Sequence, residues 1–232
     1  MMKRLTQKLL SLLALLSAEV VVLWAVFFGC LLLFLAMANE VFRQGDTALD
    51  DALFRFADSH TSPPVTRLMI GISFFASAEY LLVVPPLVVL VFSFFKGLRW
   101  LGLKVLLISM SSAILNQVMK RIFERPRPEM AMLEQSGLSF PSGHAMIGGS
   151  FYGLLIYIVW RTVPHALWRW ALTVLLTLLI LLIGYSRIYL KVHYATDVLA
   201  GYAMGLLWLL LSVYLMRRLE KAFVEKVEEK QA

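Results

Sequence analysis

Three short polar segments interrupt an otherwise apolar chain, and their residue types suit phosphate chemistry. The segments are KRIFERPRP at 120–128, PSGH at 141–144 and SRIYLKVHYATD at 186–197. They include three cations, Lys120, Arg127 and Arg187. Cations in excess of nearby acids favour a polyanion, and a guanidinium group can pair with two phosphate oxygens at once. We therefore expect these side chains to bind a phosphate group.

The second and third segments also supply the groups of an oriented nucleophile. His193 and Asp197 are spaced i, i+4, so on a helix they share a face and can hydrogen-bond. The aspartate would fix the ring tautomer and leave the other ring nitrogen free to attack. His144 remains as a proton donor for the leaving oxygen, a role suited to a side chain titrating near neutral pH. Ser142 and Gly143 begin a predicted helix, where free N–H groups and the helix dipole favour an anion.

A metal or cofactor is not expected. The segments lack the cluster of carboxylates that would hold Mg²⁺, so we predict a metal-independent reaction. The single cysteine, Cys30, lies in an apolar stretch and leaves no cysteine-based metal site and no internal disulfide.

Together the three segments resemble the signature of the type 2 phosphatidic acid phosphatase superfamily, which shares its site with the vanadium haloperoxidases. That signature is Lys, six residues and Arg-Pro; Pro-Ser-Gly-His; and Ser-Arg, five residues, His, three residues and Asp. The matching positions are Lys120, Arg127, Pro128, Pro141, Ser142, Gly143, His144, Ser186, Arg187, His193 and Asp197. The resemblance implies that His193 takes the phosphoryl group, that Asp197 supports it and that His144 protonates the leaving alcohol. It also implies that the three cations, with the two residues before His144, bind the phosphate.

The composition indicates that a bilayer surrounds these segments. The chain of 232 residues is 60% hydrophobic and 16% charged, with a mean hydropathy of +0.77, whereas a soluble domain is about half apolar and a quarter charged. Uncharged or nearly uncharged stretches at 20–37, 171–185 and 199–216 approach the roughly 20 residues that span a membrane. We predict a single all-α membrane domain over 1–232, with the motifs at 120–197.

Six membrane-spanning helices are predicted: at about 18–38, from about residue 79, at 99–123, from just after Pro141 to near Trp160, at 166–185 and at 193–216. The apolar stretch 68–95 is too long for one straight span, so a short helix near the surface should precede residue 79. Pro85 and Pro86 should bend this stretch, because proline removes a helix hydrogen bond. We expect an uncleaved amphipathic lead-in before the first span, a polar loop with room for a short helix at 39–66, and a tail at about 217–232.

The distribution of positive charge predicts the orientation. With both termini cytoplasmic, the cytoplasmic segments carry more than half of the 22 basic residues: Lys3, Arg4, Lys8, Lys96, Arg99, Lys104, Arg161, Arg169, Arg217, Arg218, Lys221, Lys226 and Lys230. Positive charge prefers the cytoplasmic side of a membrane, which also explains the net charge of +7 without nucleic acid. The three motifs then share the outer face of a bacterial inner membrane, toward the periplasm or exterior.

Other polar residues have simpler interpretations. Basic side chains at helix ends commonly extend toward lipid headgroups, and we interpret Arg121, Arg125 and Lys191 in this way. His165 lies in a predicted cytoplasmic turn and is expected to be solvated. His60, in the first outer loop, has no partner that the sequence identifies.

Three functions are compatible with these features. The best supported is hydrolysis of lipid phosphomonoesters or diphosphates, with phosphatidic acid, phosphatidylglycerol phosphate, undecaprenyl diphosphate and phosphorylated lipid A as candidate substrates. A phosphotransferase that passes the phosphoryl group to another lipid, such as lipid A, shares the first half-reaction. A transporter would need polar residues through the middle of the membrane, and the two last predicted helices have almost none. The sequence leaves the lipid and the oligomeric state open.

Overall fold

The computed structural model describes residues 18–45 and 47–229, and this part of the chain contains helices and no strand. The helices are α2 (Ala18–Asn39), η1 (Glu40–Gln44), α3 (Ala48–Asp58), α4 (Pro63–Phe74), α5 (Ala78–Ser93), η2 (Lys96–Leu98), α6 (Arg99–Phe123), η3 (His144–Gly148), α7 (Gly149–Thr162), α8 (Ala166–Tyr189) and α9 (Ala195–Glu229). The predicted all-α class is confirmed. The expected lead-in at 1–17 lies outside the described residues.

Length and hydropathy identify the helices that can cross a membrane. Four stretches qualify by themselves: Val20–Gln44, Lys96–Phe123, Ala166–Tyr189 and Ala195–Phe223. A fifth candidate is the pair α4 and α5, which qualifies if the two helices form one bent span. The chain is therefore a membrane protein with four or five candidate spans. The remaining long helix, α7, has only 14 residues, so the count of six stays a prediction.

The predicted break before residue 79 is present, but the bend lies at the start of α5 and not at Pro85 and Pro86. Helices α4 and α5 meet at an angle of 43° across the residues between Phe74 and Ala78. The Ser77 hydroxyl accepts a hydrogen bond from the backbone N–H of Tyr80 and caps the start of α5. Helix α5 continues through Pro85 and Pro86. The placement of the bend at the prolines was therefore wrong.

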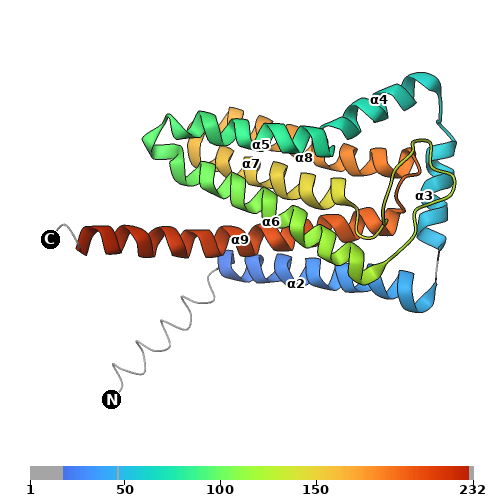
Figure 1. Cartoon of the computed structure of the whole chain (residues 1–232), viewed down its shortest axis with the longest axis horizontal. Coiled ribbons are helices and arrows are strands. Elements are labelled where there is room, and N and C mark those ends of the chain that lie inside the picture. Colours follow the sequence, from blue (N-terminus) through green and yellow to red (C-terminus); the bar gives the residue numbers. More distant parts are fainter. Residues whose placement is uncertain (1–17, 46, 230–232) are drawn as a thin grey trace, which may run out of the picture.

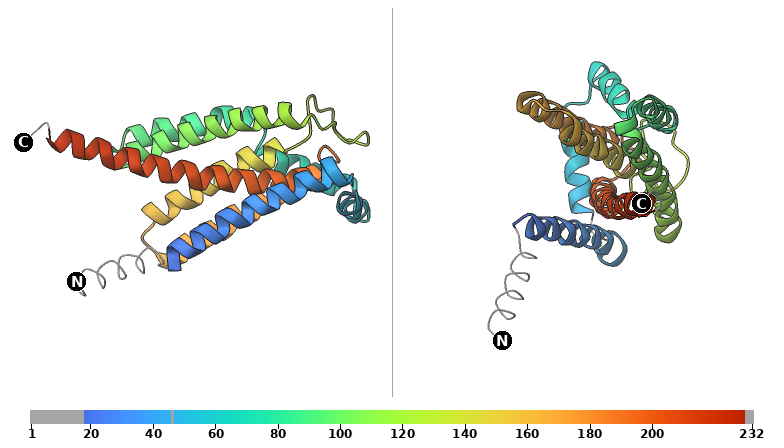
Figure 2. Two further views of the ribbon diagram at one scale, coloured as in Figure 1. Left: turned by 90° about the horizontal axis from the view of Figure 1, so that it is seen from below. Right: turned by 90° about the vertical axis from the view of Figure 1, so that its left-hand side faces the viewer.

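The long helices run side by side, and α3 crosses one end of the bundle (Figure 1). The loop that joins α6 to η3 lies at the same end, whereas the described ends of α2 and α9 that lead to the chain termini lie at the other (Figures 1 and 2). The three polar segments all occur at the end that α3 covers, because each one joins or begins a long helix there.

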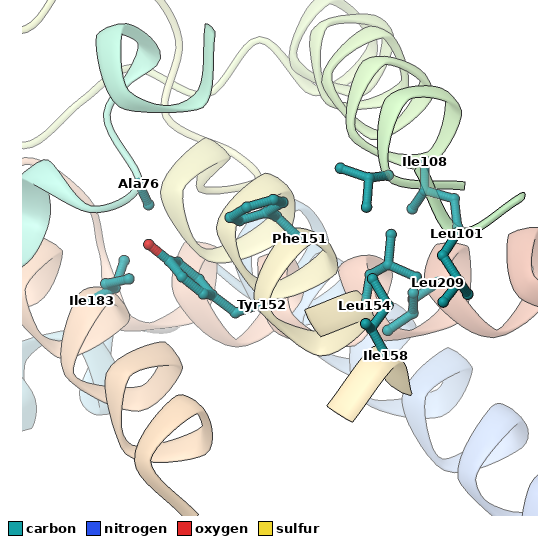
Figure 3. Packing of buried hydrophobic residues seen from close by; sticks show 10 residues of the cluster. Ala76, Leu101, Ile108, Phe151, Tyr152, Leu154, Ile158, Ile183 and Leu209 are labelled. Carbon is teal, nitrogen blue, oxygen red and sulfur yellow. The ribbon is translucent and has the colours of Figure 1, made fainter. Parts of the chain in front are cut away.

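Helix α7 forms the centre of the bundle. Its Phe151, Tyr152 and Leu154 are buried and pack against Ile108 of α6 and Ile183 of α8, as Figure 3 shows. By contrast, only 6% of the most apolar window of α8 is buried within the protein. Large apolar side chains that face outward in this way fit contact with lipid. Helix α7, which follows the PSGH segment and η3, instead packs in the core between α6 and α8.

Candidate active site

The PSGH segment packs directly against the start of α9. The Ser142 N–H donates to the backbone oxygen of Asp197 at 3.0 Å. Glycines on α9 permit the close approach: a Cβ at Gly201 would lie 2.8 Å from the Ser142 oxygen, and one at Gly205 would lie 2.6 Å from the Met146 oxygen. Any larger residue would push η3 away from α9, so these two glycines allow the second and third motifs to pack together.

His193 is buried with its two ring nitrogens in different surroundings. It lies in the turn just before α9 and is 1% exposed. Its Nδ1 faces Asp197 Oδ2 at 3.4 Å and Ser139 Oγ at 3.2 Å. Its Nε2 lies 3.2 Å from an Arg127 guanidinium nitrogen. A proton on Nδ1 would be held by these acceptors, which leaves Nε2 unprotonated as the acceptor that faces the Arg127 guanidinium group.

Burial also favours the neutral form of this ring. Desolvation lowers the pKa of His193 to about 4, although Asp197 acts in the opposite direction. The turn at His193 lies outside the candidate spans. As the pH falls from 7, the ring therefore stays uncharged until about pH 4, and a neutral imidazole is the form that can act as a nucleophile.

Asp197 is fully buried and held by four donors besides its contact with His193. Its Oδ1 accepts from Arg125 at 2.7 Å, and its Oδ2 accepts from the Ser139 hydroxyl at 2.5 Å and from the Tyr194 N–H at 3.0 Å. The fourth donation is made to its backbone oxygen by Ser142. The interpretation of Arg125 as a residue that extends toward headgroups was wrong. Ser139 and Arg125 were both missed as members of the site.

The three predicted phosphate-binding cations are held by neutral groups. Lys120 Nζ donates to the backbone oxygens of Leu138 and Ser139. Arg127 donates to the Val192 oxygen at 2.8 Å. Arg187 is 2% exposed, and its guanidinium group donates to the Ser73 hydroxyl and, at 3.3 Å, to the Gln135 side chain. Within residues 18–45 and 47–229, none of the three forms an ion pair with a carboxylate.

The hydrogen-bonded group of Ser142 is its backbone N–H and not its hydroxyl. The prediction of a free N–H group at this position was wrong, because that N–H is bonded to Asp197. The Ser142 side chain is fully buried, and its Oγ lacks a hydrogen-bond partner within the described residues. Buried hydroxyl groups are seldom left unpaired, so this oxygen is suited to donate to a bound phosphate. Gly143 fits closely against α6: a Cβ there would lie 3.1 Å from Asn116 Oδ1.

A cavity of about 570 Å³ joins the polar site to an apolar groove. At its polar end are Lys120, Arg127, Gly143, His144 and His193. The apolar part is lined mainly by side chains of α5, α6 and η3: Leu81, Leu82, Pro85, Pro86, Leu106, Met110, Ala113 and Ile147. The cavity therefore has room for a charged group at one end and an apolar chain at the other.

Two other polar side chains interpreted from the sequence, Lys191 and His60, have partners that the sequence did not indicate. Lys191 forms an ion pair with Asp58 at 2.7 Å, so its interpretation as a headgroup contact was wrong. His60 Nε2 lies 2.5 Å from the Tyr185 hydroxyl. Arg121 is exposed, as its interpretation required. Within the described parts of the chain, no group of three or more His, Cys, Asp or Glu side chains could hold a metal ion.

Comparison with known proteins supports the resemblance seen in the motifs. Residues 101–221 match the model of the PAP2 superfamily. Phosphatidylglycerophosphatase B of Bacillus subtilis is 33% identical over 180 residues, which cover 76% of this chain and 87% of the relative. A putative undecaprenyl-diphosphatase of Escherichia coli is 28% identical over 66% of this chain and 76% of the relative. An undecaprenyl-diphosphatase of Sulfolobus acidocaldarius is 28% identical over 66% of this chain and 71% of the relative.

Solved structures agree at the level of the fold. The crystal structure of a transmembrane PAP2-type phosphatidylglycerolphosphate phosphatase from Bacillus subtilis matches with a TM-score of 0.74 and 29% identity, covering 87% of this chain and 96% of that one. The structure of LpxE from Aquifex aeolicus matches with a TM-score of 0.58 and 26% identity, covering 73% of this chain and 97% of that one. With the family model matching more than half of its residues, this chain belongs to the PAP2 superfamily and is a membrane-embedded hydrolase of phosphate esters.

Proposed function

We propose that this protein removes the terminal phosphate of a membrane lipid through a phosphohistidine at His193. The observation that carries the proposal is the setting of Nε2: it lies beside Arg127 at the polar end of an apolar cavity, together with Lys120 and His144. Cations without carboxylate partners favour an anion, and the apolar lining favours a lipid chain that remains close to the bilayer.

The first half-reaction forms the covalent intermediate. The Nε2 lone pair of His193 attacks phosphorus, a P–N bond forms and the P–O bond to the lipid breaks. His144 gives its proton to the departing oxygen. The imidazole becomes positively charged as it takes the phosphoryl group, and the Asp197 carboxylate on the Nδ1 side stabilises that charge.

The second half-reaction restores the enzyme. Water attacks the phosphorus of the phosphohistidine, the P–N bond breaks and inorganic phosphate leaves. His144, now neutral, accepts the proton from the attacking water and is ready for another cycle. Throughout, the charges of Lys120, Arg127 and Arg187 and the Ser142 hydroxyl would stabilise the phosphoryl oxygens, where negative charge is greatest. No step requires a metal ion, so activity should persist in EDTA.

The names of the relatives narrow the substrates to test. Phosphatidylglycerophosphatase B, at 33% identity, favours a phosphomonoester such as phosphatidylglycerol phosphate. The two undecaprenyl-diphosphatase relatives, at 28% identity, keep undecaprenyl diphosphate as the next candidate. Transfer of the phosphoryl group to a second lipid would use the same intermediate, and the release of free phosphate separates hydrolysis from transfer.

The proposed setting is the bacterial inner membrane, crossed six times, with both termini cytoplasmic and the site at the outer face. The positive-inside distribution of charge supports this orientation. It can be tested in intact cells with Cys30→Ala protein that carries one new cysteine, at Gly137 or at His165. A membrane-impermeant maleimide should label only the position 137 cysteine. Labelling of the position 165 cysteine alone would indicate the opposite orientation.

A panel of lipids tests the function itself. The purified full-length chain is assayed for phosphate release from phosphatidic acid, phosphatidylglycerol phosphate, undecaprenyl diphosphate and phosphorylated lipid A, with and without EDTA. His193→Ala serves as the blank. We expect phosphate release from at least one lipid. This release should be absent in the blank, persist in EDTA and be inhibited by vanadate. Equal release by the His193→Ala protein would refute the assignment of the nucleophile.

A further inference from the structure

We propose that Asp50 of α3 is a positioning residue of the active site, which acts through Arg125 on Asp197 and His193. The inference rests on the proposed function, because it concerns the step in which His193 takes the phosphoryl group. Asp50 is not part of the three-segment signature and does not line the cavity. Its effect must therefore reach the reaction through other side chains.

A single guanidinium group connects the two carboxylates. One terminal nitrogen of Arg125 donates to Asp50 Oδ2 at 2.9 Å, and the other donates to Asp197 Oδ1 at 2.7 Å. The second nitrogen also donates to Thr196 Oγ1 at 2.7 Å. The guanidinium carbon lies 3.8 Å from the centre of the Tyr194 ring. These contacts fix the plane of the guanidinium group, so its charge is shared between two defined acceptors.

Asp50 also holds the first turn of α9, on which Asp197 lies. Its Oδ1 accepts from the Thr196 N–H at 2.8 Å and from the Thr196 hydroxyl at 3.0 Å. Its side chain is 1% exposed, so the carboxylate is desolvated. A carboxylate bound to an N–H group at a helix start is favoured by the helix dipole. One side chain of α3 therefore fixes both the backbone beside Asp197 and the cation that contacts it.

The order of charges explains how Asp50 would assist the reaction. Asp50 is negative, Arg125 positive and Asp197 negative, and His193 becomes positive when its Nε2 forms the bond to phosphorus. If Asp50 were neutral, Arg125 would attract the Asp197 charge without competition, and less of it would stabilise the developing imidazolium. Buried charges interact strongly at these distances. The effect should fall on kcat, because the phosphate-binding cations do not contact Asp50.

A purely structural role for Asp50 can be distinguished with a matched residue on the same helix. Asp58, also on α3, forms an ion pair with Lys191 at 2.7 Å. That pair also connects α3 to the segment between α8 and α9, but it does not contact Asp197. Asp58→Asn therefore removes one negative charge and one attachment of α3 while it leaves the Asp50–Arg125–Asp197 contacts in place.

The experiment compares Asp50→Asn with Asp58→Asn in the purified full-length protein. For Asp50→Asn we expect kcat to fall about 10- to 100-fold, with KM and the inhibition constant of vanadate within about 3-fold of wild type. Asp50→Glu should recover most of the rate, and Asp58→Asn should keep wild-type kinetics. A kcat within about 2-fold of wild type for Asp50→Asn, or equal losses in the two Asn variants, would overturn the proposal.

A double-mutant cycle tests whether Arg125 carries the effect. If it does, adding Asp50→Asn to an Arg125→Gln protein should lower kcat by less than about 3-fold further, whereas full multiplication of the two losses would contradict it. If Asp50→Asn does not fold, Arg125→Gln decides: it removes the positive charge that contacts both carboxylates, so a normal kcat would refute the inference. An active His193→Ala would instead refute the proposed function, which keeps the two failures distinct.

Discussion

Helix α6 carries two buried lysines, and their surroundings differ in a way that separates structure from function. Lys104 is 2% exposed and forms an ion pair with Glu220 of α9 at 2.7 Å. Lys120, on the same helix, is 8% exposed and donates only to backbone oxygens of Leu138 and Ser139 among the described residues. Lys104 therefore has a counter-ion within the protein, whereas Lys120 has none among the described residues.

The same contrast extends across the end of the bundle that α3 covers. Arg125 and Lys191 are paired with aspartates, whereas Lys120, Arg127 and Arg187 have no carboxylate partner within the described residues. An unpaired buried charge is costly, and in membrane proteins it usually marks a functional site. The difference teaches that pairing, more than burial or residue type, distinguishes the cations that stabilise the bundle from those that would bind phosphate.

The largest expected effect comes from removing His193, the proposed nucleophile, which lies among the cations without carboxylate partners. His193→Ala should lower kcat by at least about 10⁴-fold, because without the phosphohistidine the catalytic groups no longer act as a unit. Phosphate release from the preferred lipid measures the loss, with His165→Ala at a distant, exposed position as the control. If the protein is folded and retains more than a tenth of wild-type activity, His193 is not the nucleophile.

The two lysines of α6 provide a direct test of the comparison. Lys120→Ala should lower kcat/KM about 10³-fold, because one stabilising donor for the phosphoryl oxygens is lost. Lys104→Ala should change kcat/KM by less than about 3-fold and should instead lower the melting temperature, since Glu220 loses its partner. Activity assays and thermal unfolding of the purified proteins measure both effects. The reverse pattern would show that pairing does not separate the two roles.

A smaller and selective effect is expected for His144. With a lipid alcohol as leaving group, His144→Ala should slow turnover about 10²-fold, because the departing oxygen needs a proton. With p-nitrophenyl phosphate the loss should be under about 10-fold, since a phenolate leaves without protonation. The two substrates are compared by steady-state kinetics on one preparation. Equal losses on both would argue against His144 as the acid.

The smallest expected effect concerns the protonation of the His193 ring, which can be followed by changing the pH of the intact protein. Burial lowers the pKa of His193 to about 4, so the ring should remain neutral at pH 5. The chain has only four histidines, so ¹⁵N NMR of histidine-labelled protein in detergent can follow each ring. His193→Gln assigns the signal by its absence. A midpoint near 6.5 for that signal would show that the ring is more hydrated than its 1% exposure indicates.

Several features of this site could be predicted from the sequence because they depend on local spacing. The helix at Arg99–Phe123 has the predicted bounds. The predicted contact between His193 and Asp197 is also present, although His193 lies in the turn before α9 and not on the helix itself. The start of η3 after Pro141 also follows from local signals. Such features need only the rise of a helix and the pattern of apolar residues.

The rest depends on contacts between distant segments, which spacing does not reveal. Asp50 reaches Arg125 and Thr196 only because α3 crosses the end of the bundle, and no pattern near Asp50 indicates this path. Ser139 belongs to the site because the loop before η3 folds over His193. The headgroup interpretation of Arg125 was reasonable for an isolated helix end, but two buried carboxylates outweighed it.

The stereochemical course at phosphorus tests the phosphohistidine most directly. A thiophosphate monoester made chiral with ¹⁶O and ¹⁸O is hydrolysed in H₂¹⁷O, and the configuration of the released thiophosphate is determined. Two successive in-line displacements, first by His193 and then by water, predict net retention whether or not the intermediate accumulates. Net inversion would mean that water attacks the substrate directly, and it would contradict a covalent role for His193.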